Sequence, residues 1–318
     1  MARNRMLKMT MLIVVMAISA AAQEDLYVAR DLLPVGTLMS AEGPAVDAHG
    51  ILYCVNIGAL GTIARVSPDG TAELFAELPP GSRGNGIRFD RAGAMFVADY
   101  TGHNVVRVDM VSGVVSVFAH EATMNQPNDL AIGADDRLYA SDPNWSANNG
   151  KLWRIDPNGA VALLEANLGT TNGVEVGADE RTLYVNESAQ RNVWAYDLSV
   201  TGEVSNRRLL IRFPDFGMDG MRSDAAGNLY ITRYGKGTVA MVSREGDLLR
   251  EIDLAAQNPT NIAFGGPDGR TAYVTTQDRG NVETFRVQFP GRSWALRHPE
   301  TVVGPMSWGQ MKRRSPER

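Results

Sequence analysis

Six polar residues open six similar short phrases along the chain, and they are the residues whose types and spacing could do chemistry. The phrases are Glu42-Gly-Pro, Asn85-Gly-Ile, Asn128-Asp-Leu, Asn172-Gly-Val, Asp219-Gly-Met and Asn261-Ile-Ala, and the steps between their openers are 43, 43, 44, 47 and 42 residues. Glu, Asp and Asn side chains carry the oxygen atoms that hard divalent cations prefer. If each repeat brings its opener to one axis, the six side chains form a ring of oxygen ligands.

The repeat itself predicts the elements that would position these openers. A period near forty residues with four short apolar stretches is typical of a β-propeller, in which each unit folds as one four-stranded blade. In the second unit the expected strands cover residues 86–90, 94–99, 105–109 and 114–118, with Gly, Asp and Asn between them. We therefore expect an all-β protein, a six-bladed β-propeller of four-stranded antiparallel blades.

An aromatic residue marks the second strand of every unit, 11 or 12 residues after the opener. These residues are Tyr53, Phe96, Tyr139, Tyr184, Tyr230 and Tyr273. Aromatic side chains at equivalent positions would fill the space between neighbouring blades. Residues 24–33 precede the first opener without a partner, and we expect them to add the outermost strand to the last blade and so close the ring.

The two ends of the sequence differ from the repeats. Residues 1–22 combine Arg3, Arg5 and Lys8 with an apolar run and Ala20-Ala-Ala, which predicts a signal peptide cleaved before Gln23. The apolar run is shorter than the roughly 20 residues that span a membrane. The expected organisation is therefore a signal peptide over 1–22, a propeller over 23–298 and a polar, basic, disordered tail over 299–318, in a periplasmic or secreted protein.

Charge and cysteine content narrow the classes of partner. Removing residues 1–22 takes away three positive charges and no negative one, so the formal net charge of −5 becomes −8. An acidic chain without a basic stripe is a poor partner for nucleic acid or an anionic membrane. We expect a small-molecule substrate instead, and the sequence indicates no oligomeric state. The single cysteine, Cys54, is predicted to be a small buried side chain.

The openers are not uniform, and the exceptions favour a metal site. Glu42 is a poor turn former, yet it holds a position that Asn or Asp holds elsewhere. Together Glu42, Asn128, Asn172 and Asp219 offer two carboxylates and two amide oxygens. That set suits Ca²⁺ best and also Mg²⁺ or Mn²⁺, whereas Zn²⁺ is less favoured because no His or Cys belongs to it. The alternative is that these residues only make turns and cap strands, as Asn261 in particular would.

The phrases around the openers resemble one known family. Pro127-Asn-Asp-Leu, Thr171-Asn-Gly-Val, Met218-Asp-Gly-Met and Thr260-Asn-Ile-Ala-Phe-Gly-Gly are similar to phrases of the gluconolactonase, regucalcin (senescence marker protein) and luciferin-regenerating-enzyme family. The resemblance covers about residues 32–289. It implies a six-bladed propeller with one catalytic divalent metal in the channel. On the family pattern Glu42, Asn172 and Asp219 match the metal ligands.

The same resemblance suggests further roles. Asn128 matches an asparagine that either ligates the metal or holds substrate and water beside it, and Asp219 also matches the proposed general base. Asn85 is expected to contact the substrate. Gln126 stands where the regucalcin branch has a substrate-contacting arginine, so a contact there would be made by an amide. The role of Asp142 in an Asp-Pro pair is left open.

Two other features bear on specificity and catalysis. The Pro-Asn-Trp145 stretch departs from the family's usual wording, and we expect substrate choice to depend on it if its loop lines the channel mouth. Of the four histidines, His103 lies in a loop that could approach a mouth, and its role is left open. No Gly-x-Ser-x-Gly or Gly-Lys-Ser/Thr motif is present, which removes the serine-hydrolase and nucleotide-hydrolase classes.

Two functional hypotheses follow. The first is a secreted, divalent-metal-dependent hydrolase of a lactone or related cyclic ester, in which the metal polarises the carbonyl and Asp219 activates water. The second is a non-enzymatic propeller that binds a ligand or a protein at its channel mouth around a structural metal. Propellers host many unrelated functions, so the fold alone does not choose between the two.

Overall fold

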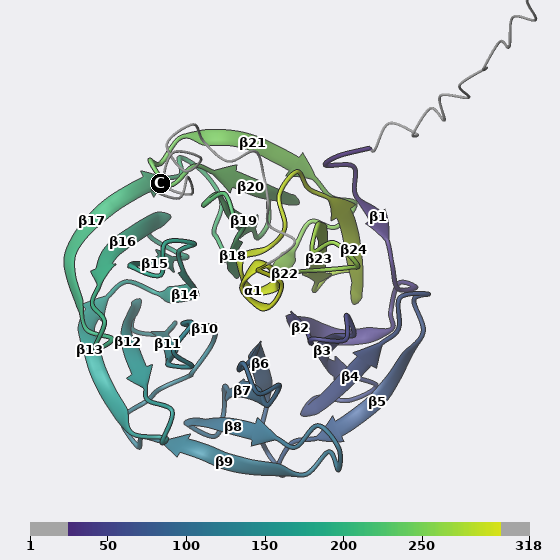
Figure 1. Ribbon diagram of the computed structural model, residues 1–318, viewed down its shortest axis with the longest axis horizontal. Coiled ribbons are helices and arrows are strands. Elements are labelled where there is room, and N and C mark those ends of the chain that lie inside the picture. Colours follow the sequence, from purple (N-terminus) through teal and green to yellow (C-terminus); the bar gives the residue numbers. More distant parts are fainter. Residues whose placement is uncertain (1–24, 300–318) are drawn as a thin grey trace, which may run out of the picture.

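Six antiparallel sheets of four strands stand around a central axis (Figure 1). The structure, a computed structural model, describes residues 25–299. The first three blades comprise β2 (Leu38–Val46), β3 (Leu52–Ile57), β4 (Thr62–Val66) and β5 (Ala72–Glu77); β6 (Gly84–Phe89), β7 (Met95–Asp99), β8 (Asn104–Val108) and β9 (Val115–His120); and β10 (Leu130–Ile132), β11 (Leu138–Asn144), β12 (Asn149–Ile155) and β13 (Val161–Leu168). The last three comprise β14 (Thr171–Val176), β15 (Thr182–Glu187), β16 (Asn192–Leu198) and β17 (Val204–Arg212); β18 (Met221–Ser223), β19 (Leu229–Arg233), β20 (Thr238–Val242) and β21 (Leu248–Asp253); and β22 (Pro259–Gly265), β23 (Thr271–Thr276), β24 (Asn281–Arg286) and β1 (Arg30–Asp31).

In blades one to five the chain runs as a meander from the innermost strand outwards. The predicted six-bladed propeller is therefore confirmed, and the strands predicted for the second unit agree with β6 to β9 within two residues at each end. The order of each sheet places the six openers on, or next to, the innermost strands.

The first hairpin of several blades is held by one repeated local contact. Asp47 Oδ1 accepts a hydrogen bond from the backbone N–H of Ile51 (2.9 Å), and Asp90 Oδ1 does the same for Ala94 (2.8 Å). Such an Asx contact, with glycine at the left-handed position before the second strand, fixes a tight turn at little steric cost. The turn sets the length of the hairpin, and so the register of the two strands that carry the opener and the aromatic marker.

The aromatic markers pack between blades, as predicted. All six are less than a tenth exposed. Tyr53 of the first blade meets Phe89 of the second edge to face with ring centres 5.6 Å apart, and Tyr230 of the fifth meets Phe264 of the sixth at 5.1 Å. Offset and edge-on aromatic pairs of this kind add to the burial of apolar surface between packed sheets.

The ring closes through the segment that precedes the first blade. β1 pairs with β24 in antiparallel register, Arg30 opposite Thr284 and Asp31 opposite Glu283, and becomes the outermost strand of the sixth blade. The carboxylate of Asp31 accepts hydrogen bonds from Arg279 at 2.7 and 2.8 Å. The predicted closure is confirmed, and the pairing removes the free edge that β24 would otherwise expose.

One element was absent from the sequence-based prediction. The short helix α1 (Arg292–Arg297) follows the last blade and lies over the centre of the ring (Figure 1). Within residues 25–299 no helix has both the length and the apolar character needed to cross a bilayer. The predicted signal peptide over 1–22 and most of the predicted tail over 299–318 lie outside the described residues.

Candidate active site and metal centre

The openers of five blades meet at one end of the channel. Glu42, Asn85, Asn128, Asn172 and Asp219 all line a single cavity of about 520 Å³. That size lies within the range of small-molecule sites in proteins. The sequence repeat thus predicted which side chains share this space, because equivalent positions of equivalent strands arrive at the same height on the axis.

Three asparagines in this cavity carry an oxygen without a partner. The Oδ1 atoms of Asn85, Asn128 and Asn172 are each buried and accept no hydrogen bond from the described residues. Asn128 and Asn172 are only 5% and 3% exposed. A buried polar atom without a partner costs free energy, so such atoms usually mark a bound water, ion or ligand. Three of them around one cavity indicate a site that supplies oxygen ligands.

Asn261, the sixth opener, is built differently. Its Oδ1 accepts a hydrogen bond from the backbone N–H of Ile262 (2.9 Å), and its Nδ2 donates to Asp129 (3.3 Å). Asn261 does not belong to the cavity lining. Its amide is satisfied inside the protein, so its role is structural, as expected from the sequence.

The two carboxylates of the ring stand in an environment that disfavours two negative charges. Burial raises the pKa of Glu42 to about 8, and the nearby charge of Asp129 acts in the same direction. Burial and the charge of Glu42 raise the pKa of Asp219 well above its ordinary value. Paired carboxylates with raised pKa values are common where a cation or a proton transfer is part of the site's function.

The position of Asp219 is fixed through its backbone rather than through its carboxylate. Its N–H donates to Thr232 O (3.0 Å), and its carbonyl accepts from Asn186 Nδ2 (2.6 Å) and from the N–H of Gly173 (3.2 Å). Asn172 donates a side-chain hydrogen bond to its carboxylate. Backbone anchoring of this kind orients the carboxylate toward the cavity without neutralising it with a positive charge.

Glycine follows most of the openers because the innermost strands crowd near the axis. A Cβ on Gly43, whose φ is +56°, would lie 2.0 Å from the carbonyl oxygen of Asn85 in the next blade. A Cβ on Gly173 would lie 2.5 Å from the carbonyl oxygen of Asp219. Both contacts are far inside van der Waals separation, so only glycine lets neighbouring openers approach one another this closely.

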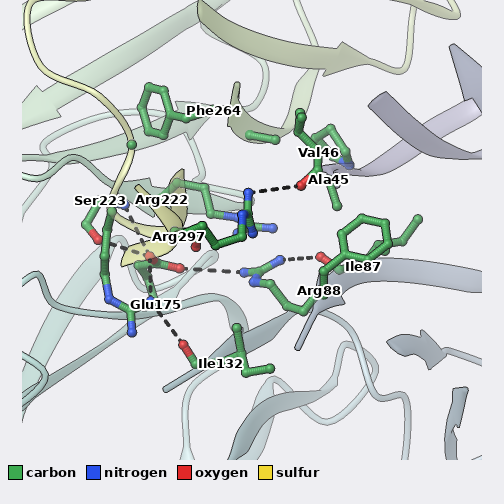
Figure 2. A pocket seen from close by; sticks show the side chains of 16 residues that line it. Ala45, Val46, Ile87, Arg88, Ile132, Glu175, Arg222, Ser223, Phe264 and Arg297 are labelled. Atoms are coloured by element: carbon green, nitrogen blue, oxygen red, sulfur yellow. Dashed lines mark hydrogen bonds and ion pairs between the residues drawn. The ribbon is translucent and has the colours of Figure 1, made fainter. Parts of the chain in front are cut away.

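Beneath the ring of openers the channel is filled by ion pairs. Arg222 lies 3.1 Å from Asp129, and Arg88 lies 3.5 Å from Asp129 and 3.7 Å from Glu175. Figure 2 shows Arg88, Arg222 and Glu175 around the pocket at this lower level. Burial acts to raise the pKa of Asp129, but the two guanidinium groups outweigh it and hold that pKa below its ordinary value. Asp129 therefore adds a negative charge below Glu42 and Asp219.

Helix α1 completes this network from the end of the channel opposite the cavity. Its first residue, Arg292, is 3% exposed, donates to the carbonyl of Ile132 (3.0 Å) and binds Glu180 (2.6 Å). Arg88 nevertheless remains short of compensation, since burial and the charge of Arg222 lower its pKa to about 9. Residues at this end of the channel are committed to one another, and the free polar atoms lie at the other end.

Three residues discussed from the sequence lie outside the cavity lining. Gln126 is half-buried and accepts a hydrogen bond from Asn125 Nδ2 (3.3 Å), so its substrate contact stays a prediction. Asp142 is buried and accepts from the N–H of Gln126 (2.6 Å) and from Trp153 Nε1 (2.9 Å), which is a structural role. The Nδ1 of His103 lies 2.6 Å from the carbonyl oxygen of Met124, and none of the four histidines lines the cavity.

A second ring of side chains surrounds the cavity above the openers. In each blade it comes from the connection between the second and third strands, and its members are Leu60, Tyr100, Trp145, Ser188, Tyr234 and Gln277. Only Trp145 was singled out from the sequence, and it does line the mouth. The others lie 15 to 18 residues after their openers, and this variable spacing obscured the pattern.

The donor set at the cavity fits a hard cation better than a soft one. Within residues 25–299 no group of three His, Cys, Asp or Glu side chains converges, and the ring instead combines two carboxylates with three unpaired amide oxygens. Ca²⁺ and Mg²⁺ bind all-oxygen sets of this kind. The single cysteine lies elsewhere, fully buried at Cys54 as predicted, where burial raises the pKa of its thiol.

Comparisons with known proteins agree with this architecture. Over 272 residues the chain is 30% identical to a gluconolactonase from Zymomonas mobilis, covering 74% of this chain and 75% of that protein. It is 33% identical over 153 residues to a pentonolactonase from Haloferax volcanii, covering 47% of this chain and 52% of that protein. The crystal structure of a calcium-binding protein, regucalcin, from Agrobacterium tumefaciens superposes with a TM-score of 0.71 at 21% identity, covering 81% of this chain and 96% of that one.

A family model matches most of the propeller. The region described as SMP-30/Gluconolactonase/LRE-like spans residues 40–278, from just before the first opener to the end of the second hairpin connection in the last blade. The match therefore includes every residue of the opener ring. The chain belongs to the SMP-30/gluconolactonase/LRE-like family.

Proposed function

We propose that this protein is a lactone hydrolase whose channel mouth holds one divalent cation, most simply Ca²⁺. The observation that carries the proposal is the convergence of two carboxylates and three unpartnered amide oxygens on one cavity. The names of the relatives support it, because two are lactonases of sugar acids and one is described as calcium-binding. The chemistry of the donor set points to the same class of cation.

Glu42, Asn172 and Asp219 would hold the cation, and Asn128 either joins them or holds substrate and water beside it. When bound, the cation polarises the carbonyl oxygen of the lactone and stabilises negative charge on it. The protein's own contribution is a cavity in which the unpaired oxygens of Asn85 and Asn128 can orient the substrate and the attacking water. The glycine that follows each of four openers keeps these groups close together.

Asp219 would act as the general base. Its backbone is fixed by three hydrogen bonds while its carboxylate faces the cavity, and its pKa is raised by burial and by Glu42. A base with a raised pKa takes a proton from water more readily than an ordinary carboxylate does. Asp219 Oδ would accept the proton of the attacking water and return it to the leaving alkoxide oxygen as the ring opens.

The first test of the proposal replaces the base. Asp219→Asn should retain the fold and lower kcat/KM for lactones by about 10³-fold, since general-base catalysis contributes roughly 10² to 10⁴. Hydrolysis is followed by acid release in weak buffer, with Ca²⁺ present and after chelation. Asp136→Asn, on an exposed turn far from the mouth, is the matched control and should leave kcat/KM unchanged.

Two outcomes would overturn the proposal. One is lactone hydrolysis by Asp219→Asn at the wild-type rate. The other is an absence of hydrolysis with any of Ca²⁺, Mg²⁺, Mn²⁺ and Zn²⁺, which would favour a binding protein with a structural metal. Calcium binding has its own readout, because a ligand that binds only the folded state raises the midpoint of thermal unfolding.

We also propose that the protein acts outside the cytoplasm, in the periplasm or as a secreted protein. The basic, apolar and small-residue segments of residues 1–22 support this proposal. The N-terminus of the protein isolated from its own cells should be Gln23. An N-terminus that retains residues 1–22 would contradict export by cleavage.

A further inference from the structure

The rim of the cavity differs in chemistry from its floor. The floor is the ring of polar openers, whereas four of the six rim side chains, one each from four blades, are aliphatic or aromatic: Leu60, Tyr100, Trp145 and Tyr234. Leu60 and Trp145 are each 41% exposed. Single exposed apolar residues are ordinary on a surface, but a set gathered around a cavity marks a binding surface for an apolar group.

The polar groups of the same wall are largely committed inside the protein. Asn56 donates to Ser40 O (3.1 Å) and accepts from the N–H of Gly61 (3.2 Å), so both ends of its amide are used. Ser188 donates to Met218 O at 2.5 Å. The hydroxyl of Tyr234 donates to Gln277 Oε1. A substrate rich in hydroxyl groups would find few free partners on these walls, and each hydroxyl buried without a partner would cost affinity.

The exposed Trp145 is held in place rather than left on a loose loop. β11 and β12 remain paired up to Asn144 and Asn149, so the third blade projects its hairpin further than the short connection alone requires. Asn144 Oδ1 accepts from Ser146 Oγ (2.9 Å) and from the N–H of Ala147 (3.1 Å), which closes the turn. Trp145 in addition donates a side-chain hydrogen bond to Tyr100. The indole is therefore preorganised beside the cavity, which lowers the cost of binding against it.

From this arrangement we infer that the substrate is a lactone bearing an apolar, ring-like or alkyl substituent, rather than a polyhydroxylated sugar-acid lactone. The inference rests on the proposed lactone hydrolysis and names the substrate class for the same cavity. The floor engages the ester group that all lactones share. The rim, with Trp145, Tyr100 and Leu60, selects the substituent, which gains by leaving water against these side chains.

The experiment compares three six-membered aliphatic lactones of graded polarity, in buffer with Ca²⁺. They are D-glucono-1,5-lactone, unsubstituted δ-valerolactone and δ-valerolactone carrying a phenyl group on the carbon next to the ring oxygen. The expected order of kcat/KM is phenyl-substituted, then unsubstituted, then glucono-lactone, with about 10-fold or more between the first and the last, as one well-filled apolar subsite provides.

Variants assign the preference to the rim. Trp145→Ala and Leu60→Ala should lower kcat/KM for the phenyl-substituted lactone about 10-fold and change that for δ-valerolactone less than about 3-fold. Leu209→Ala is the matched control, because Leu209 is 49% exposed on the outermost strand β17, and it should change neither value. A loss confined to the substituted substrate separates a subsite from a general loss of folding.

The outcomes separate this inference from the proposed function. Hydrolysis of glucono-lactone as fast as or faster than the phenyl-substituted lactone would overturn the inference and leave lactone hydrolysis standing. Equal losses on both δ-valerolactones in Trp145→Ala would also overturn it. If none of the three lactones is hydrolysed, the proposed function fails and the inference falls with it.

Discussion

At the scale of single residues, the ring of openers separates into two kinds of side chain that the sequence writes almost identically. Asn261 has both ends of its amide bonded inside the protein, whereas Asn172, at the equivalent position two blades earlier, directs an unpaired oxygen toward the cavity. The difference comes from the following residue. Gly173 leaves room for close approach, while Ile262 gives its N–H to the side chain of Asn261.

Glu42 gives a prediction that depends on pH. In the metal-free protein its pKa is raised from 4.5 to about 8, so between these values the folded state keeps a proton that the unfolded chain has lost. This contribution to stability is fully present below about pH 4.5 and disappears as the pH rises through about 8. Glu42→Gln, which is neutral at every pH, should remove this dependence.

The measurement is urea denaturation in the presence of a chelator at pH 5 and pH 8. Relative to Glu42→Gln, the wild type should lose about 2 kcal/mol of unfolding free energy between the two values, a shift of 1.36 kcal/mol per pKa unit being discounted for partial exposure. Glu73→Gln on the outermost strand β5 is the control. Parallel behaviour of wild type and Glu42→Gln across this range would contradict the assignment. Added Ca²⁺ should stabilise the wild type more than Glu42→Gln.

At the scale of elements, periodicity was informative where equivalent residues occupy equivalent places and uninformative elsewhere. The strands, their order and the aromatic contacts between blades could be predicted because each repeats six times. The charged residues of the channel could not be placed. Arg88, Glu175 and Arg222 each stand three residues after an opener in an otherwise apolar strand, and that shared offset is the signal that would have revealed them.

Helix α1 and the rim show where the repeat carries no information. The helix occurs once, has six residues, and gains its place through Arg292 and through Trp294, which packs against Gly269. Those are tertiary contacts without a local sequence pattern. The rim residues follow a connection whose length varies from blade to blade, so no fixed spacing identifies them. Specificity is therefore encoded in the part of each blade that repeats least.

The glycine after the first opener tests whether the crowding of innermost strands matters. Gly43 and Gly50 both have positive φ, +56° and +82°, so alanine at either position should incur about 1–2 kcal/mol of backbone strain. Only at Gly43 would the new Cβ also collide with Asn85 O. Gly43→Ala should therefore cost about 1–3 kcal/mol more than Gly50→Ala, the usual cost of overpacking.

Urea denaturation of the two variants gives this difference directly. Gly43→Ala should also weaken the binding of Ca²⁺ followed by calorimetry, because relief of the collision moves Asn85 or Glu42 away from the cavity. Gly50→Ala, whose Cβ meets nothing within 4 Å, should bind Ca²⁺ as the wild type does. Equal destabilisation by the two substitutions would show that the close approach of the strands is not limiting.

At the scale of the whole molecule, the ring is continuous in space but joined at one seam by residues far apart in sequence. Blades one to five each consist of consecutive strands, whereas the sixth takes its outermost strand from the N-terminal side of the chain. That strand, β1, has only two residues, and the surrounding contacts include Leu32 N–H to Val282 O at 2.8 Å. Closure by so short a strand makes the seam the place where the ring is most easily opened.

Asp31 tests this view of the seam. It accepts two hydrogen bonds from Arg279 and one from Asn281 Nδ2 (2.8 Å), and hydrogen bonding to Arg279 holds its pKa below the ordinary 3.8. Asp31→Ala should cost about 1 kcal/mol at pH 7, and the difference from wild type should shrink as the pH falls below 3.8, because protonation removes the same contacts. In native-state hydrogen exchange the amides of β1 and β24 should exchange faster in Asp31→Ala, while those of the other five blades stay as protected as in the wild type. Asp25→Ala, which removes only an exposed pair with Arg30, is the control, and uniform acceleration in all six blades would contradict a weak seam.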